Sequence, residues 1–242
     1  MAHVLSVNRA RPKAVPYTDP EVGVTGIDKR PVEGPVTVAA PGPLGQAGSG
    51  IAGDAVCDRR FHGGDDQAVY AYASEDLACW SRELGCELAP GAFGENLTTE
   101  GIDVNSALIG ERWRIGAEVV LEVTSGRIPC RTFAGQLDRL GAPPMRGRGG
   151  GWVRRFTQRA CPGPYLRVIT GGEVSAGDPI TVLSRPGHEV TVALLFRAMT
   201  TEPALLEGAF AATEDVLNAA HAKMIRTRLK RRAGVRARGG AS

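Results

Sequence analysis

The 242-residue sequence lacks any uninterrupted apolar run of about 18 residues, and no basic stretch followed by an apolar core opens it. A membrane span and a secretory signal are therefore not expected, and neither is a membrane partner. Hydrophobic residues make up 43% of the chain, which suffices for a sizeable core. We expect a cytoplasmic, globular protein.

The sequence also lacks a Cys-x-x-Cys pair, and its cysteine count is odd. The five cysteines are Cys57, Cys79, Cys86, Cys130 and Cys161. An odd count without a signal peptide argues against a disulfide framework and favours free thiols in a reducing compartment. The four histidines are scattered along the chain, so a structural zinc site has little support.

Acidic residues are absent from positions 222–242, which hold eight Lys or Arg residues. Removing these eight from the 29 basic residues leaves 21, against 26 acidic residues in the rest of the chain. A cationic run of this kind can contact nucleic acid, but the cationic end of a helix more often stays solvated. No aromatic residues are interleaved for base stacking, so a nucleic-acid partner is not expected.

Short β-rich runs bounded by Gly, Pro or Asp recur along the first three quarters of the chain. They cover residues 36–39, 68–72, 112–115, 119–123, 166–169 and 180–183. This pattern predicts a mixed, mainly β fold with a barrel-like or sandwich-like sheet. We expect this β-rich domain to occupy residues 1–188.

Helical patterns interrupt and follow the strands. Residues 74–84 have Ser74 as a possible cap and Leu77, Trp80 and Leu84 on one face, which predicts a helix. Residues 141–151 are rich in Gly, Pro and Arg and predict an exposed loop, after which a helix restarts at Trp152.

Beyond residue 188 the chain changes to helical character. Helix starts are expected at Thr201-Glu202-Pro203 and at Thr213-Glu214-Asp215. We expect a helical appendage over 189–235 and a disordered basic tail over 236–242.

Two loop segments combine glycines with polar groups. In Arg59-Arg60-Phe61-His62-Gly63-Gly64-Asp65, paired glycines can expose backbone N–H groups to an anion that the arginines neutralise. In Phe93-Gly94-Glu95-Asn96-Leu97, Asn96 offers a donor and an acceptor for a heterocyclic ring. A simple hairpin and an Asn-capped turn would have the same sequences, so both readings stay open.

A third segment carries the most reactive group. In Thr124-Ser125-Gly126-Arg127-Ile128-Pro129-Cys130, Cys130 follows an apolar run and lies near Arg127 and Arg131. Nearby guanidinium groups favour the thiolate, which can act as a nucleophile or a soft metal ligand. An inert thiol remains an alternative, as does a cysteine hydrolase that pairs Cys130 with His62, although no orienting third residue is evident.

Taken together, these segments resemble the MOSC domain family, named for the C-terminal domain of molybdenum cofactor sulfurase, in its free-standing bacterial branch called YiiM-like. The resemblance covers nearly the whole chain, including the helical tail. Its motifs are His3-Val4-Leu5-Ser6-Val7-Asn8, Gly26-Ile27-Asp28-Lys29-Arg30-Pro31-Val32, Arg60-Phe61-His62-Gly63-Gly64, Phe93-Gly94-Glu95-Asn96-Leu97-Thr98, Pro129-Cys130 and Gly177-Asp178.

The resemblance implies a MOSC-type β-barrel-like domain with short helices and a C-terminal helical appendage. It further implies a pterin-bound molybdenum cofactor (molybdopterin) with Cys130 as the metal ligand. Related reductases remove oxygen from N-hydroxylated substrates with electrons from a separate flavin or cytochrome protein. The residues that would hold the cofactor are Arg60, His62, Gly63, Gly64, Asn96, Ser125, Arg127 and Arg131. His62 is also a candidate proton donor, so we count it with Cys130 as catalytic.

An alternative role is sulfur transfer, in which Cys130 carries a persulfide supplied by a pyridoxal-phosphate-dependent cysteine desulfurase. The chain also departs from the family's cysteine loop, because Gly126 replaces a proline, and Arg131 and Thr132 follow Cys130. The loop at 141–151 would lie where substrate approaches, and whether it gates the site is open. The substrate, the electron donor and the oligomeric state are also open.

Overall fold

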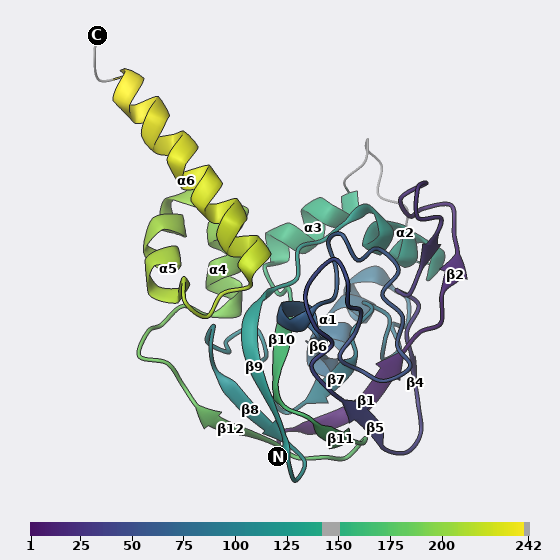
Figure 1. The fold of residues 1–242 in the computed structure, drawn as a ribbon. Coiled ribbons are helices and arrows are strands. Elements are labelled where there is room, and N and C mark those ends of the chain that lie inside the picture. The colour runs from purple at the N-terminus through teal and green to yellow at the C-terminus, as the bar shows by residue number, and fades with distance from the viewer. Residues whose placement is uncertain (142–150, 240–242) are drawn as a thin grey trace.

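The computed structural model describes residues 1–141 and 151–239, with side chains described up to residue 232. Figure 1 shows the strands forming the lower body of the molecule, with helices packed above them. In chain order the elements are β1 (His3–Arg9), β2 (Lys13–Ala14), β3 (Val24–Thr25), β4 (Arg30–Pro31), β5 (Val36–Val38), η1 (Asp65–Gln67), β6 (Val69–Ala73), α1 (Ser74–Leu84), β7 (Leu97–Glu100), β8 (Arg112–Ile115), β9 (Val119–Gly126), α2 (Arg131–Arg139), α3 (Gly151–Arg159), β10 (Pro164–Thr170), β11 (Gly172–Val174), β12 (Ile180–Ser184), α4 (Val192–Met199), η2 (Pro203–Leu205), α5 (Leu206–Thr213) and α6 (Ala219–Gly239).

The main sheet has eight strands in the order β12-β8-β9-β10-β6-β7-β1-β4. Its pairs are antiparallel except for β6 with β7. The chain just before β12 returns to β1, where His3 bridges to Pro179 and the Val4 N–H donates to the Asp178 carbonyl at 2.9 Å. The sheet therefore curls back toward its own first strand, and the predicted mainly β, barrel-like fold is confirmed.

Alternation of buried and exposed residues explains the strands that the sequence predicted well. In β8, Trp113 and Ile115 are buried while the two arginines between them face outward. The prediction for 112–115 is confirmed to the residue. The run predicted to end at Val123 continues as β9 to Gly126, because Ser125 pairs with Tyr165 and Gly126 with Pro164 of β10. Long-range pairing thus extends a strand whose last residues are poor strand formers.

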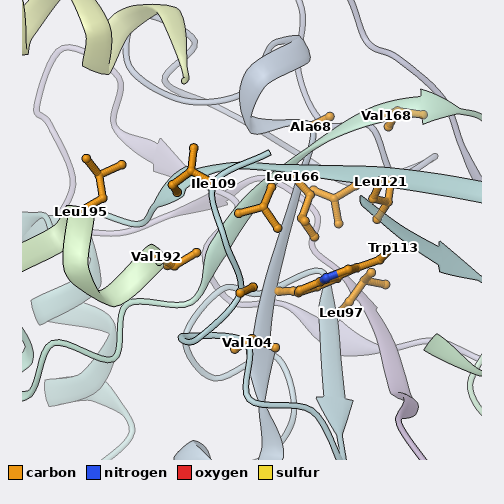
Figure 2. Packing of buried hydrophobic residues seen from close by; sticks show 14 of the residues in the cluster. Ala68, Leu97, Val104, Ile109, Trp113, Leu121, Leu166, Val168, Val192 and Leu195 are labelled. Carbon is orange, nitrogen blue, oxygen red and sulfur yellow. The ribbon is translucent and has the colours of Figure 1, made fainter. Parts of the chain in front are cut away.

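Two hydrophobic clusters fill the interior. The larger one is mostly aliphatic, is formed largely by residues of the main sheet and includes Trp113, Leu121 and Leu166 (Figure 2). The smaller one is aromatic and contains Trp80 of α1, Phe133 of α2 and the α3 side chains Trp152 and Phe156. The predicted helix over 74–84 is confirmed, with Leu77, Trp80 and Leu84 buried. Ser74 is its first helical residue and makes no capping hydrogen bond, so the predicted cap is wrong.

The C-terminal helices share the core of the sheet. Val192 and Leu195 of α4, together with Phe210 of α5, belong to the same aliphatic cluster as the strands. The expected domain boundary at residue 188 therefore lies just before helices whose side chains belong to the same hydrophobic core as the strands. The helix start expected at Thr213-Glu214-Asp215 is wrong, because α5 ends at Thr213 and α6 begins at Ala219.

Helix α6 projects from the body beside α4 and α5 (Figure 1). It continues to Gly239 and so includes positions 236–239, which we had assigned to a tail. Most of the Gly-rich segment 141–151 lies outside the described residues, but the helix expected after it is confirmed as α3. None of the helices in the described ranges combines the length and the apolar character that a membrane crossing requires.

Candidate functional site

A cavity of about 130 Å³ opens between the N-terminal loops and the carboxyl end of β9. Residues from five separate parts of the chain line it, so no local sequence pattern describes it. Its reactive and charged lining residues are Asp19, Lys29, Asp54, Cys57, Asp58, His62, Arg127 and Cys130. Polar or aromatic groups are supplied by Thr18, Thr25, Ser49, Gln67, Tyr70, Asn96, Thr132 and Tyr165.

Cys130 lies at the junction between β9 and α2, as the residue immediately before the helix. Burial raises the pKa of its thiol, but a side-chain hydrogen bond from His62, the charge of Arg127 and a backbone hydrogen bond from Phe133 lower it more strongly. The resulting pKa is about 6, against an ordinary value of 9.0. Cys130 is therefore mostly thiolate at neutral pH.

Arg127 provides a fixed positive charge beside this thiolate. Its side chain is 6% exposed and donates to the Phe93 carbonyl. The guanidinium carbon lies 5.0 Å from the ring centre of Tyr70 and 4.9 Å from that of Phe133. Two aromatic faces and a carbonyl hold the cation in place, and no carboxylate in the described part of the chain pairs with it, so its charge remains available to an anion in the cavity.

His62 lies in the glycine-containing loop and lines the cavity, where it hydrogen-bonds to Cys130. The sequence alone could not show this contact. The two glycines after it have positive φ angles, 78° at Gly63 and 74° at Gly64. A Cβ at Gly63 would lie 2.5 Å from the Gly48 carbonyl oxygen. The Gly64 N–H donates to that same oxygen at 3.0 Å, so this glycine packs one loop against another rather than facing an anion.

Among the described residues, no carboxylate is hydrogen-bonded to His62 in the manner of a hydrolase triad. Asp58, which interacts electrostatically with His62, uses both side-chain oxygens to accept from Arg60, at 2.8 Å and 3.0 Å. The described structure therefore supplies no orienting third residue for the cysteine hydrolase alternative.

Another part of the cavity lining is an internally paired polar network. Lys29 is 7% exposed and forms an ion pair with Asp54, whose side chain is fully buried. Asp54 also accepts from the Ala10 N–H and from the Asn96 amide, both at 2.9 Å. Burial lowers the pKa of Lys29, although Asp54 opposes that shift. Every polar group of the ion pair is thus partnered within the protein.

Of the predicted site residues, Cys130, His62, Gly63, Asn96 and Arg127 line the cavity. The amide oxygen of Asn96 accepts from the Tyr70 N–H at 3.2 Å, and its nitrogen donates to Asp54. Its expected donor and acceptor are therefore both occupied by the protein.

The other predicted residues lie outside the lining. Arg60 is exposed and pairs with three carboxylates, those of Asp19, Glu21 and Asp58. Gly64 packs against the neighbouring loop, Ser125 is fully buried in β9 with no partner for its hydroxyl, and Arg131 is exposed at the start of α2. The structure thus separates these four from the groups that face the cavity.

Sequence reasoning did not assign site roles to Lys29, Asp54, Gln67, Tyr70 or Tyr165. Lys29 lies in the segment 26–32 that carried part of the family resemblance, so a signal existed for it. The other four have no local motif, because their place in the cavity depends on how distant loops pack.

The metal-binding side chains of the cavity suit a metal whose other ligands come from a cofactor. Among the described residues, no group of three or more His, Cys, Asp or Glu side chains could hold a metal ion. Cys130 can therefore offer one soft thiolate to a metal. The lysine and arginine side chains that line the cavity are Lys29 and Arg127. A phosphorylated, metal-bearing organic cofactor needs this combination of a thiolate and nearby cations.

Similar proteins are known for most of the length of this chain. The model of the MOSC domain family matches residues 58–181. The uncharacterized protein YflK of Bacillus subtilis is 32% identical over 189 residues, which cover 78% of this chain and 76% of YflK. A protein named reductase from Gibberella moniliformis is 30% identical over 167 residues, 67% of this chain but 26% of that much longer protein.

Among solved structures, YiiM from Geobacillus stearothermophilus superposes with a TM-score of 0.71 at 24% identity. The match covers 95% of this chain and 100% of that one. The arrangement of strands and C-terminal helices is therefore shared over the full length.

Proposed function

The chain belongs to the MOSC domain family as a free-standing YiiM-like protein, and from that premise we propose that its cavity binds a pterin-bound molybdenum through Cys130. We further propose that the protein reduces N-hydroxylated compounds. A separate flavin or cytochrome protein would supply the electrons. The reductase-named relative from Gibberella moniliformis supports an oxidoreductase activity.

The observation that carries this proposal is Cys130 at the cavity wall, with its thiol pKa lowered to about 6 between His62 and Arg127. A thiol that ionises below neutral pH can ligate a metal without first losing a proton to solvent. When bound, the molybdenum cofactor would supply two-electron oxygen-atom chemistry. The protein's own groups would hold and orient the reactants around it.

Cys130, Arg127 and His62 each have a distinct role in this proposal. The thiolate sulfur of Cys130 binds the metal. The guanidinium of Arg127 attracts the anionic parts of the cofactor and keeps the sulfur ionised. The ring N–H of His62 that bonds to Cys130 can deliver a proton, since reduction of an N–OH group to N–H consumes two electrons and two protons and releases water.

The phosphate of the cofactor would lie near Arg127 rather than near Arg60. Arg60 is exposed and already paired with three carboxylates, and Lys29 is paired with Asp54, whereas Arg127 lines the cavity and donates to a backbone carbonyl. The role first expected of Arg60 is therefore proposed for Arg127.

Metal analysis of protein made in a molybdopterin-competent host tests the proposal. Wild type should carry about one molybdenum per chain, and Cys130→Ser should carry almost none. Cys79→Ser is the matched control, because Cys79 lies on α1 and does not line the cavity. Folded wild-type protein that contains no molybdenum and still reduces an N-hydroxylated compound would refute the metal assignment.

A second candidate function is sulfur transfer through a Cys130 persulfide. The same lowered pKa supports it, because a thiolate attacks the sulfane sulfur held on a cysteine desulfurase and so takes over that sulfur. Incubation with a desulfurase and cysteine should then add the mass of one sulfur atom to wild type and to Cys79→Ser. Absence of this adduct, or its persistence in Cys130→Ala, would exclude the candidate.

A further inference from the structure

Gln67 is a buried glutamine that faces the cavity and has an unpaired carbonyl. It is the last residue of the short helix η1, is 8% exposed and lines the cavity with Cys130 and His62. Its Oε1 is buried and has no hydrogen-bond partner. A buried acceptor without a partner costs free energy, so this position calls for a physical explanation.

The backbone that carries Gln67 is held on several sides. The Asp65 N–H donates to the Gly42 carbonyl, and the Gly42 N–H donates back to Asp65 Oδ1, both at 2.8 Å. Asp66 accepts from Arg167 at 2.6 Å. The Gln67 N–H donates to the Gly64 carbonyl at 3.0 Å. Because η1 is fixed in this way, the backbone cannot shift freely to bring the Gln67 amide to a partner elsewhere.

Other polar groups of the cavity wall contrast with Gln67. Asp54 and Asn96 bond to each other and to the backbone, and the Tyr70 hydroxyl donates to the Pro162 carbonyl at 2.8 Å. Among the described residues that line the cavity, Gln67 alone has a buried side-chain atom left without a partner. The described protein groups supply no donor, so a donor has to come from a molecule that enters the cavity.

We propose that Gln67 Oε1 accepts a hydrogen bond from an N–H or O–H group on the ring-bearing ligand of this cavity. The inference rests on the proposed function and deepens it. Phosphate oxygens that carry charge only accept hydrogen bonds, so Gln67 marks where a neutral donor group of the ligand lies and not where the phosphate lies. Both the pyrimidine edge of a pterin and an N-hydroxylated substrate offer such a donor.

The first test compares two buried glutamines in protein prepared without cofactor. Gln136 is 1% exposed, accepts from Tyr17 and Arg139 at 3.2 Å, and does not line the cavity. Gln136→Met should lower the midpoint of thermal unfolding. Gln67→Met should leave it unchanged or raise it, because it removes an unpaired acceptor. A lower midpoint for Gln67→Met, similar to that of Gln136→Met, would overturn the proposal.

The second test measures binding in protein from a molybdopterin-competent host. If the pterin is the donor, Gln67→Met should bind it about tenfold more weakly, which corresponds to ~1.4 kcal/mol, and retain less of it through purification than wild type. If the substrate is the donor, pterin content should match wild type and KM should rise about tenfold with little change in kcat.

The two failures can be told apart by the wild-type control. Wild type without pterin and molybdenum would refute the proposed function itself. Wild type loaded with cofactor, alongside a Gln67→Met variant of equal pterin content and equal KM, would overturn the Gln67 inference alone. In protein from the molybdopterin-competent host, Gln136→Met should keep its cofactor, since its defect is confined to stability.

Discussion

Two parts of the cavity lining use buried polar groups in opposite ways. In the first, called here the closed wall, Lys29, Asp54 and Asn96 bond to each other and to the backbone. In the second, the reactive wall, Cys130 is ionised by His62 and Arg127, and Arg127 has no carboxylate partner among the described residues. The closed wall is suited to hold the loops together, and the other is suited to bind and react. Proximity to a cavity alone therefore does not identify a functional residue.

The largest effect should come from breaking the closed wall. Asp54→Ala leaves the ammonium group of Lys29 buried without its counterion, and such a change typically costs about 3–5 kcal/mol of folding free energy. Denaturant unfolding of the cofactor-free protein measures it. The double variant with Lys29→Met and Asp54→Ala should recover part of the loss, because the stranded charge is gone. A double variant as unstable as the single one would show that the ion pair is not what stabilises this wall.

An intermediate effect should come from weakening the reactive wall. In cofactor-free wild type, the alkylation rate of Cys130 should rise with pH around a midpoint near 6, since only the thiolate reacts. His62→Gln removes the ring N–H that bonds to the sulfur and should raise this midpoint. If the pKa rises by about two units, alkylation at pH 7 slows about tenfold. Mass spectrometry of the peptide that contains Cys130 follows the reaction among the other cysteines.

Arg131→Gln is the matched control for this titration. Arg131 is adjacent to Cys130 in sequence but exposed, and it is not among the groups that shift the thiol pKa. Its substitution should leave the midpoint near 6. A larger shift with Arg131→Gln than with His62→Gln would mean that solvent-exposed charge, rather than the buried contact, ionises Cys130.

Acid should also weaken the folded state through Cys130. The folded-state pKa lies below the ordinary value, so the thiolate contributes stability that is fully present above pH 9 and is lost as pH falls through about 6. The difference in unfolding free energy between wild type and Cys130→Ala should therefore shift in favour of wild type as pH rises from 6 to 9. A difference that is flat over this interval would contradict the ionised thiol.

The smallest effect should come from Ser125, which belongs to neither wall. Its hydroxyl is buried without a partner and lies outside the cavity lining. Ser125→Ala should change the unfolding free energy by no more than about 1 kcal/mol and should leave molybdenum content at the wild-type level. Loss of the metal in this variant would place Ser125 back among the cofactor-binding residues that the family resemblance suggested.

By itself the sequence determined most of the local elements and singled out Cys130 as the candidate reactive residue. The 3.6-residue period over Leu77, Trp80 and Leu84 and the alternation in 112–115 depend on neighbours a few positions apart, so they could be read from sequence. The position of Arg127 and Cys130 just after an apolar run was likewise visible, and both line the cavity.

Only the tertiary structure decided which polar groups face the cavity with capacity to spare. Arg60 meets Asp19 from 41 positions away, and Asn96 meets Asp54 from 42 positions away, so both groups are occupied within the protein. His62 instead reaches Cys130, and Gln67 is left without a partner. The physical reason is that hydrogen-bonding capacity is a property of the residue, whereas its satisfaction depends on which distant groups folding buries beside it.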